Sequence, residues 1–573
     1  MTCCKKGACS LNKISELLIN TFLPNTRPVE CLHHLKQNWY FPLTALAFFY
    51  PEVQWGNDFC KANLTIPSMA LAFIAMMLIA SQVSDLWSAV RWLPWWLNVF
   101  VILSAIGICW RLQTYAFDFF CTSLQKSSEQ AYPISMALAL GSFLFVYVCL
   151  AHFWQRLTQL FQETRVFSDL HPFEVGIYAF LFVLTLLFAA RLFLMTTVFY
   201  DARPDGFYDL IYTSDSGGLV RNMGWLYLTY PENDLRQPLF AVFAAPFVGA
   251  PYALGEFLGL SITSEVILIN TLQITLLFVA NFMLSRLLNL TTTARVCFMV
   301  MLTATYSTLL NVLMIEQYVT AYFWLVLTLV CLLRGQRNTN FALYGAGGTL
   351  LTSLALLPVI GGNAPGKTPK RWLQDMLRRG AEFAALLLAW GRFDVYYSLL
   401  AKIESLCSFT GEEISFSDRL RQFTGFVHDC FLSPAASVGE NTLSSAPHIA
   451  WMLEPVEHIN WFGVLLLALC LISAAWNWEE RIARLSIYWI GFSLLLLVVL
   501  GWGTQENGLT LYVLYFCWAF FILLFMLIQR AADILKQPLL LPVVCIAVTA
   551  LLLLVNLAGV KGMLAFGLEY YPL

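Results

Sequence analysis

The stretch Glu174–Val198, EVGIYAFLFVLTLLFAARLFLMTTV, is an apolar run with two charges, Glu174 at its start and Arg191 near its end. A helix needs about 20 apolar residues to cross a hydrocarbon layer, so this run predicts a transmembrane helix. The whole chain has the same character, since 59% of its 573 residues are hydrophobic and only 12% are charged. About a quarter of the residues of soluble proteins are charged. The sequence therefore predicts an all-α, polytopic integral membrane protein.

Other apolar runs reach a similar length. They lie near 67–85, 94–112, 133–154, 265–286, 296–314, 318–334, 459–477, 485–501, 510–529 and 538–558. Two weaker candidates are the short run Trp39–Tyr50 and the run Glu382–Leu400, which carries Arg392 and Asp394. We expect about 11 to 13 crossings in all. Two residues apart on a helix, Arg392 and Asp394 would point to different faces, so no ion pair is expected between them.

Positive charge on short loops predicts which loops stay in the cytoplasm. The loops placed there carry Arg286 with Arg295, Arg334 with Arg337, Arg481 with Arg484, and Arg530 with Lys536. This placement holds only if Gln237–Leu258 does not cross, and its three prolines suit a broken interfacial helix at the surface. The loop that begins at Asp201 then runs to about Ser264, entirely on the external face.

In the segment Tyr344–Gly362, Gly345, Gly347, Gly348 and Pro358 predict a re-entrant hairpin rather than one helix. The basic residues that follow it stay in the cytoplasm, and a span near 382–400 then carries the polar loop Ser405–His458 outside. Gly361–Thr368 matches the Walker A pattern of nucleotide-binding loops. That pattern requires a buried strand before it and a helix after it in a soluble domain, so a flexible basic loop is the preferred interpretation.

The loop Asp201–Arg236 is the most polar part of this region. It contains Ser214-Asp215-Ser216-Gly217-Gly218-Leu219-Val220-Arg221-Asn222-Met223 and continues into Arg236-Gln237-Pro238-Leu239-Phe240. A transporter is expected to carry acids and broken helices at the bilayer midplane, whereas these acids gather at one surface. The arrangement favours an enzyme that acts at the membrane surface.

The order of residues in this loop resembles the GT-C superfamily of membrane glycosyltransferases. In its aminoarabinose-transferase and protein-mannosyltransferase branches, an acidic pair is followed by Ala-Arg-Glu-Met and later by Lys-Pro-Pro-Leu. Here Asp215, Arg221, Met223 and Gln237-Pro238-Leu239 occur in that order. Ser216 stands in place of the second acid, and one proline precedes Leu239, which implies a divergent branch. The resemblance covers roughly Phe173–Arg337.

The resemblance implies transfer of a sugar, with inversion, from a polyprenyl-phosphate carrier to a lipid, glycan or protein acceptor on the external face. Asp215 would be the general base, with Asp201 and Glu316 as further catalytic acids. Arginines would bind the donor phosphate: Arg191, Arg221 and Arg236. Substrate contacts would come from Tyr318, Glu506, Asn507 and Tyr512. No cofactor is expected with certainty and no metal ligand is assigned, while a divalent cation is left open.

The implied organisation has an N-terminal transmembrane extension at 1–170, a catalytic core at 171–405 with the external loop 201–264, and further helices at 406–573. The expected location is a bacterial cytoplasmic membrane. No basic stripe of the kind that binds nucleic acid is present. The cysteines and histidines near the N-terminus do not have the spacing of a zinc finger or ribbon. The alternatives are a transporter or flippase whose external acids bind a cation or proton, and a non-catalytic scaffold.

Overall fold

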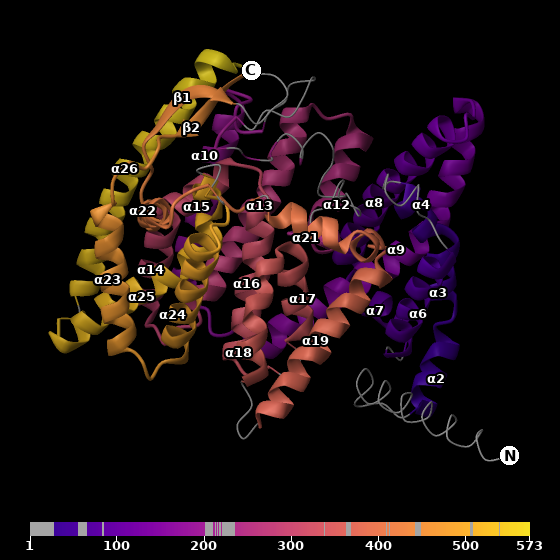
Figure 1. Cartoon of the computed structure of the whole chain (residues 1–573), viewed down its shortest axis with the longest axis horizontal. Helices are drawn as coiled ribbons and strands as arrows, with labels where there is room; N and C mark the ends of the chain where they lie inside the picture. Colours follow the sequence, from indigo (N-terminus) through magenta and orange to yellow (C-terminus); the bar gives the residue numbers. More distant parts are fainter. Residues whose placement is uncertain are drawn as a thin grey trace. The chain divides into compact units, whose positions relative to one another are not determined.

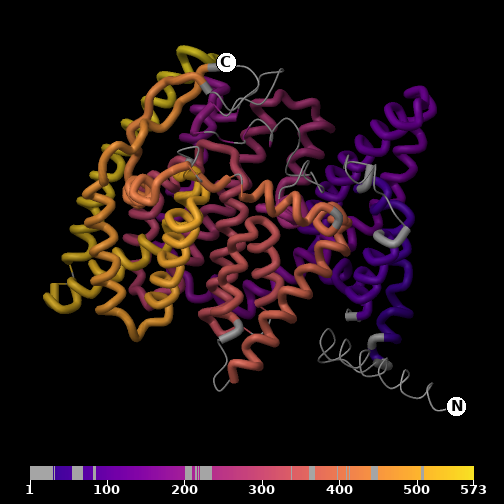
Figure 2. The backbone as a smooth tube through the Cα atoms, in the orientation of Figure 1, coloured from indigo at the N-terminus to yellow at the C-terminus, as the bar shows by residue number. Residues whose placement is uncertain are grey.

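The computed structural model describes residues 28–55, 66–82, 85–200, 210–212, 214, 216, 219, 235–336, 339–362, 368–407, 409–411, 413–441, 448–504, 508–537 and 539–573. Within these residues the chain is mainly helical (Figures 1 and 2), and its strands form one two-stranded antiparallel sheet. The chain forms two compact units. The first comprises Met1–Gln159, Leu226–Asp234 and Leu354–Leu399, and the second comprises Leu160–Trp225, Leu235–Ser353 and Leu400–Leu573.

The first unit combines helices from the N-terminal part of the chain with three helices from the segment Leu354–Leu399. Its elements are α2 (Pro28–Gln37), α3 (Tyr40–Thr44), η1 (Ala45–Phe49), α4 (Tyr50–Trp55), α6 (Ile66–Gln82), α7 (Trp87–Trp92), α8 (Trp95–Thr122), most of α9 (Ser128–Thr164), α18 (Leu357–Gly362), α19 (Pro369–Ala389) and α20 (Asp394–Tyr397). Tyr50 ties three of them together, because its buried hydroxyl lies 3.2 Å from the Ala72 carbonyl and 2.9 Å from the Ala389 carbonyl.

The second unit holds the remaining helices and the sheet. They are α10 (Pro172–Phe193), α12 (Phe240–Leu258), α13 (Ile262–Ser285), α14 (Thr292–Ala304), α15 (Tyr306–Leu313), α16 (Tyr318–Leu333), α17 (Asn340–Thr349), α21 (Leu399–Cys407), α22 (Phe416–Asp429), β1 (Ala436–Asn441), β2 (His448–Leu453), α23 (Trp461–Trp476), α24 (Arg481–Leu494), η4 (Leu495–Val499), η5 (Gly508–Tyr512), α25 (Val513–Ile534) and α26 (Leu540–Tyr570). The element η3 (Leu351–Leu356) runs from this unit into the first.

The helix α16 forms the centre of the second unit, where it packs against α13, α17 and α25 (Figure 1). All its residues from Tyr318 to Leu332 are buried. The contact with α17 depends on Gly345, since a Cβ there would lie 2.4 Å from the ring of Trp324. A residue with a side chain at this position would push the two helices apart.

The helices α10 and α13 run antiparallel. At one end, Glu174 near the start of α10 accepts hydrogen bonds from Arg295 at 2.8 and 2.9 Å, and Arg286 at the end of α13 lies 4.0 Å from the same carboxylate. Beyond the other end of α10, the Tyr200 hydroxyl lies 2.9 Å from that of Thr263. The segment that joins them therefore leaves and returns at the same end of this helix pair.

The helix α12 lies within that segment and corrects one prediction. It is a continuous helix, with Pro246 and Pro251 inside it, and most of its residues are buried against α13 and α17. The expectation of a broken surface element was therefore wrong. By length and composition α12 could cross a membrane. The segment as a whole nevertheless does not carry the chain from one end of the α10–α13 pair to the other.

The described helices are those of an integral membrane protein. Eight are long and apolar enough to cross a membrane, and they correspond to α8, α9, α10, α12, α13, α24 with η4, η5 with α25, and α26. Shorter apolar helices lie at Met69–Ser81, Tyr318–Leu333, Leu351–Ile360 and Trp461–Trp476. The predicted helix at 296–314 is in fact a pair, α14 and α15, bent by 60°. Thr305 causes the break, because its hydroxyl accepts a hydrogen bond from the Thr308 amide and caps α15.

The predicted span at Glu382–Leu400 is wrong. Helix α19 begins earlier, at Pro369, and ends at Ala389, after which Gly391 turns the chain with a φ of +78°. Arg392 and Asp394 therefore do not share one helix, and they form a buried bidentate pair with both contacts at 2.9 Å. The expectation that they would not pair failed because it assumed helical geometry.

Two further predictions concern the loops. The segment Tyr344–Gly362 is not one helix, as expected, because α17 ends at Thr349 and Leu350 is extended. The polar segment Ser405–His458 is more ordered than a loop, since it contains α22 and the strands β1 and β2. The strands pair in register from Ala436 with Leu453 to Asn441 with His448.

Candidate functional site

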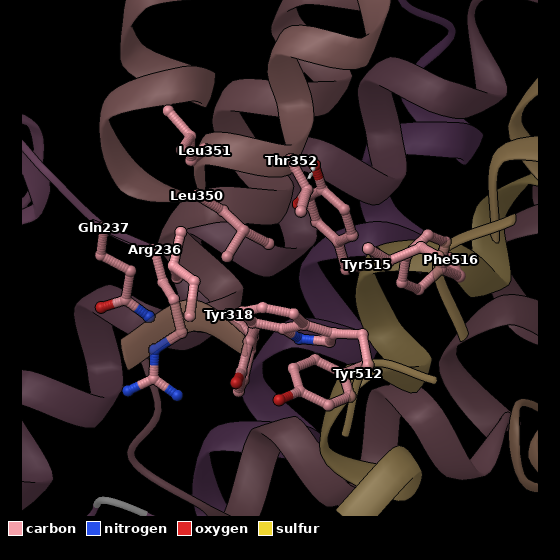
Figure 3. Close-up of a pocket in the computed structure, with 12 residues that line it drawn as sticks. Arg236, Gln237, Tyr318, Leu350, Leu351, Thr352, Tyr512, Tyr515 and Phe516 are labelled. Carbon is pink, nitrogen blue, oxygen red and sulfur yellow. Dashed lines mark hydrogen bonds between the residues drawn. The ribbon is translucent and has the colours of Figure 1, made fainter. Parts of the chain in front are cut away.

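A cavity of about 90 Å³ in the second unit brings together three residues predicted to act on the substrate: Arg236, Tyr318 and Tyr512. Figure 3 shows that they come from three separate parts of the chain. The other residues that line the cavity are mostly apolar or aromatic. They are Gln237, Leu350, Leu351, Thr352, Leu406, Leu496, Trp502, Tyr515 and Phe516.

Arg236 is fixed by its backbone and by an aromatic ring. Its carbonyl accepts a hydrogen bond of 2.6 Å from the Leu351 amide, and the Leu239 amide donates to the Gly348 carbonyl at 2.8 Å. The guanidinium carbon lies 4.2 Å from the centre of the Phe409 ring. This cation–π contact covers one face of the guanidinium, while its N–H donors point outward in the plane. Such a group can bind a phosphate with two parallel hydrogen bonds.

Three tyrosines form another part of the lining. The rings of Tyr318 and Tyr512 lie edge to face with their centres 5.4 Å apart. In the view of Figure 3 their hydroxyl groups turn toward the same side of the cavity as the Arg236 guanidinium. Tyr515 is fixed by a hydrogen bond, because its hydroxyl lies 2.6 Å from that of Ser353. The cavity therefore combines a cation with hydroxyl groups on rigid aromatic walls.

Glu316 lies in the turn between α15 and α16, two residues before Tyr318, and does not line this cavity. Its side chain is buried, and its amide donates to the Gln273 side chain at 3.2 Å. Gln273 in turn donates to the carbonyls of Asn311 and Met314 at 2.8 and 2.6 Å. This network gives the turn one conformation and sets the position at which α16 begins.

Several predicted site residues lie outside the described residues: Asp201, Asp215, Arg221, Glu506 and Asn507. The described residues near Asp215 are well anchored. Leu210 and Tyr212 bond to the backbone of Trp451 in β2 at 2.7 and 3.0 Å, and the Tyr212 hydroxyl lies 2.8 Å from that of Tyr306. Ser214 and Ser216 are both buried, and their hydroxyl groups are 2.9 Å apart.

Arg191 is not part of the cavity. Its side chain is exposed near the end of α10. An exposed arginine close to the end of an apolar helix suits an extended side chain that reaches the lipid headgroups. The structure therefore separates Arg191 from Arg236, although the sequence suggested the same role for both.

Phe409, which supports Arg236, was missed by the sequence analysis, as was the contribution of Leu351 and Thr352. No sequence signal marks them, because each belongs to a segment far along the chain from Arg236. Among the described residues, no group of three or more His, Cys, Asp or Glu side chains is placed to hold a metal ion. None of the acids of the Asp201–Arg236 loop is among those residues.

The geometry of this site is that of an arginine on an aromatic wall, next to tyrosine hydroxyl groups, in a unit rich in apolar helices. These groups can hold a phosphate whose attached chain is apolar. In comparisons with known proteins, no family model, no curated protein and no solved structure matches the chain.

Proposed function

We propose that the protein is a membrane glycosyltransferase that moves a sugar from a polyprenyl-phosphate carrier to a hydroxyl-bearing acceptor on the extracytoplasmic face. The observation that carries the proposal is the Arg236 cavity, where a guanidinium stacked on Phe409 faces the same side as two tyrosine hydroxyls. A phosphate-linked lipid has an anionic head and a long apolar tail. The cavity supplies a partner for the head, and the apolar helices provide surroundings for the tail.

In the proposed reaction the acceptor oxygen attacks the anomeric carbon of the sugar while the bond from that carbon to the phosphate oxygen breaks. The electron pair of this bond leaves with the polyprenyl phosphate, and Asp215 takes the proton of the acceptor hydroxyl. Arg236 stabilises the charge that develops on the departing phosphate. Tyr318 and Tyr512 donate hydrogen bonds to the phosphate or to the sugar. The configuration at the anomeric carbon inverts.

The anchoring of the loop supports the role of Asp215. Its neighbours Ser214 and Ser216 are buried, and Tyr212 is held by both Trp451 and Tyr306. A catalytic base gains from such support, because misplacement by about 1 Å costs on the order of a hundredfold in rate.

The test is a transfer assay in membranes that contain the full chain, with radiolabelled polyprenyl-phosphate sugars as donors. Arg236→Ala is expected to lower the rate about 100-fold, which is typical for loss of one group that stabilises developing charge. Arg236→Lys should recover part of the rate, because it restores the charge without the planar fork. The matched control is Arg530→Ala, since Arg530 is exposed at the end of α25.

Asp215→Asn should abolish most transfer if Asp215 is the base. If Arg236→Ala transfers sugar as fast as the wild type, this cavity does not bind the donor phosphate. Movement of labelled donor lipid between the two membrane leaflets, with no sugar transferred from any donor, would replace the proposal with a flippase.

A further inference from the structure

A second cavity in the same unit has a different chemical character. It encloses about 500 Å³ between the end of α22, the segment after β2 and the start of η5. Leu509 and Thr510 of η5 line it, whereas Tyr512 at the end of η5 lines the Arg236 cavity. The two cavities are therefore neighbours that share a five-residue element. No residue that lines this cavity was singled out by the sequence.

A pair of adjacent polar residues at the end of α22 lines this cavity. His428 Nδ1 lies 2.9 Å from one carboxylate oxygen of Asp429, and the Thr510 hydroxyl donates to the other oxygen at 2.9 Å. Asp429 is buried, and the ring of His428 packs edge to face against Phe462 with the centres 5.9 Å apart. The imidazole is thus held in one orientation from two sides.

The contact with Asp429 also determines what His428 presents to the cavity. An ionised carboxylate can only accept hydrogen bonds, so the contact fits a proton on Nδ1; in the neutral form of the imidazole, Nε2 is then an acceptor. Within the part of the chain that the structure describes, no hydrogen bond is recorded for Nε2. A ligand hydroxyl group is a suitable donor for this atom.

The charges around the cavity narrow the class of ligand. Glu454 and Glu457 line it together with Asp429, and among the described residues no lysine or arginine lines it, while Arg421 lies beside it and donates to the Glu457 carbonyl at 2.8 Å. An anion such as a phosphate ester would meet three carboxylates in the lining itself, so binding of an anion is disfavoured. Glu454 and Glu457 are exposed, and solvent weakens their attraction for a cation. Their oxygens, with the amides of Gln422 and Asn460, are well suited to hydroxyl groups.

We propose that this cavity is a binding site for a neutral, polyhydroxylated ligand, a carbohydrate, with His428 Nε2 accepting a hydrogen bond from one ligand hydroxyl. Asp429 and Thr510 are positioning residues that act through His428. The apolar part of the lining, which includes Phe426 and Pro434, packs against the C–H faces of the sugar ring. This inference does not depend on the transfer reaction proposed above, because it concerns a separate cavity and a separate ligand property.

The test measures binding of three ligands to the purified full chain in detergent by saturation-transfer NMR: glucose, glucose phosphate and glucosamine. The three share one ring and differ in charge. Glucose is expected to bind better than its phosphate ester, and His428→Phe is expected to weaken glucose binding about tenfold, the value of one hydrogen bond. The matched control is His33→Gln, an exposed histidine in the first unit.

A second variant tests the same cavity in case His428→Phe does not fold. Val456 lines the cavity and its side chain is 37% exposed, so Val456→Trp should fold and should obstruct the cavity, with loss of glucose binding. Thr510→Val should weaken binding less than His428→Phe does. The proposal is overturned if glucose phosphate or glucosamine binds better than glucose, or if neither His428→Phe nor Val456→Trp changes glucose binding.

Discussion

The two cavities of the second unit differ in both size and charge. The Arg236 cavity holds about 90 Å³ and is lined mainly by aromatic and apolar side chains around one cation, whereas the His428 cavity holds about 500 Å³ and is lined by polar groups that include three carboxylates. A ligand part that suits one is poorly matched to the other. Under the two proposals above, one cavity holds an anionic head and the other holds a neutral polar group.

The element η5 is common to both cavities. Thr510 bonds to Asp429 on one side, and Tyr512 packs against Tyr318 on the other. The separation of the two cavities therefore depends on the position of a short helix. Variants that act on one cavity alone test the division, while variants that move η5 test how closely the cavities are coupled.

The largest expected effect is the separation of two activities by Arg236→Ala and His428→Phe. Arg236→Ala should lower sugar transfer about 100-fold and leave glucose binding at the His428 cavity unchanged. His428→Phe should weaken glucose binding about tenfold. Transfer assays and saturation-transfer NMR on the same preparations measure both effects. If Arg236→Ala weakens glucose binding as much as it lowers transfer, the cavities are one site and the comparison fails.

A second effect concerns the support of the His428 cavity. Asn556 of α26 donates to the carbonyls of Ala304 and Phe431 at 2.8 and 2.9 Å and accepts from the Ser433 amide at 2.8 Å. Asn556→Ala leaves these buried groups without their partner and should lower the free energy of unfolding by about 3 kcal/mol. Denaturant unfolding in detergent measures it. Asn477→Ala, at the end of α23, should change it by less than about 0.5 kcal/mol. A similar loss in both variants would contradict this account.

A third, smaller effect should appear in both cavities at once. Gly503 has a φ of +70°, and a Cβ there would lie 2.8 Å from the Tyr512 ring and 3.4 Å from Leu509. Gly503→Ala should destabilise the protein by about 1 kcal/mol and should lower both transfer and glucose binding. The control is Gly491→Ala in α24, where a Cβ meets nothing within 4 Å. That change should stabilise the helix by roughly 0.5 to 1 kcal/mol, so thermal unfolding should shift in opposite directions.

The smallest effect is the pH dependence of stability. Burial raises the pKa of the Asp429 carboxyl above its ordinary value of 3.8, while the contacts with His428 and Thr510 oppose the rise. Between that value and the raised one, the folded state binds more protons than the unfolded state, so stability falls as the pH rises. Asp429→Asn lacks this group. We therefore compare the unfolding midpoints of the wild type and of Asp429→Asn. The wild-type midpoint minus that of the variant should fall as the pH is raised through this interval. A difference that stays constant with pH would contradict the raised pKa of Asp429.

The long apolar runs were sufficient to predict most of the long helices, because about 20 consecutive apolar residues match the thickness of the hydrocarbon layer when they are helical. The run 174–198 became α10 and the run 265–286 became α13. Local breaks were harder to predict. Thr305 divides a run that is apolar throughout, and Gly391 ends a helix before the residues that seemed to continue it. In both places the backbone conformation of one residue interrupts the helix, although the apolar residues around it predict one that continues.

For the candidate site, the sequence identified Arg236, Tyr318 and Tyr512, which the structure brings to one cavity. Each was chosen because it lies in or beside a predicted external loop. The sequence did not reveal Phe409 or the pair of His428 and Asp429. Their roles depend on contacts with Arg236 and Thr510, which lie in distant parts of the chain, and no local pattern encodes such a contact.

The segment that follows α10 is joined to Tyr571, which follows α26. The Thr196 hydroxyl and the Thr197 amide both donate to the carbonyl of Tyr571, across 375 positions in the first case. These bonds can therefore form only after α26 and Tyr571 have been synthesised, long after the segment that leads into the Asp201–Arg236 loop. Contacts between such distant positions form late in folding. A chain that ended before α26 would contain both α10 and α13. It would lack the bonds to Tyr571 that hold the start of the Asp201–Arg236 loop.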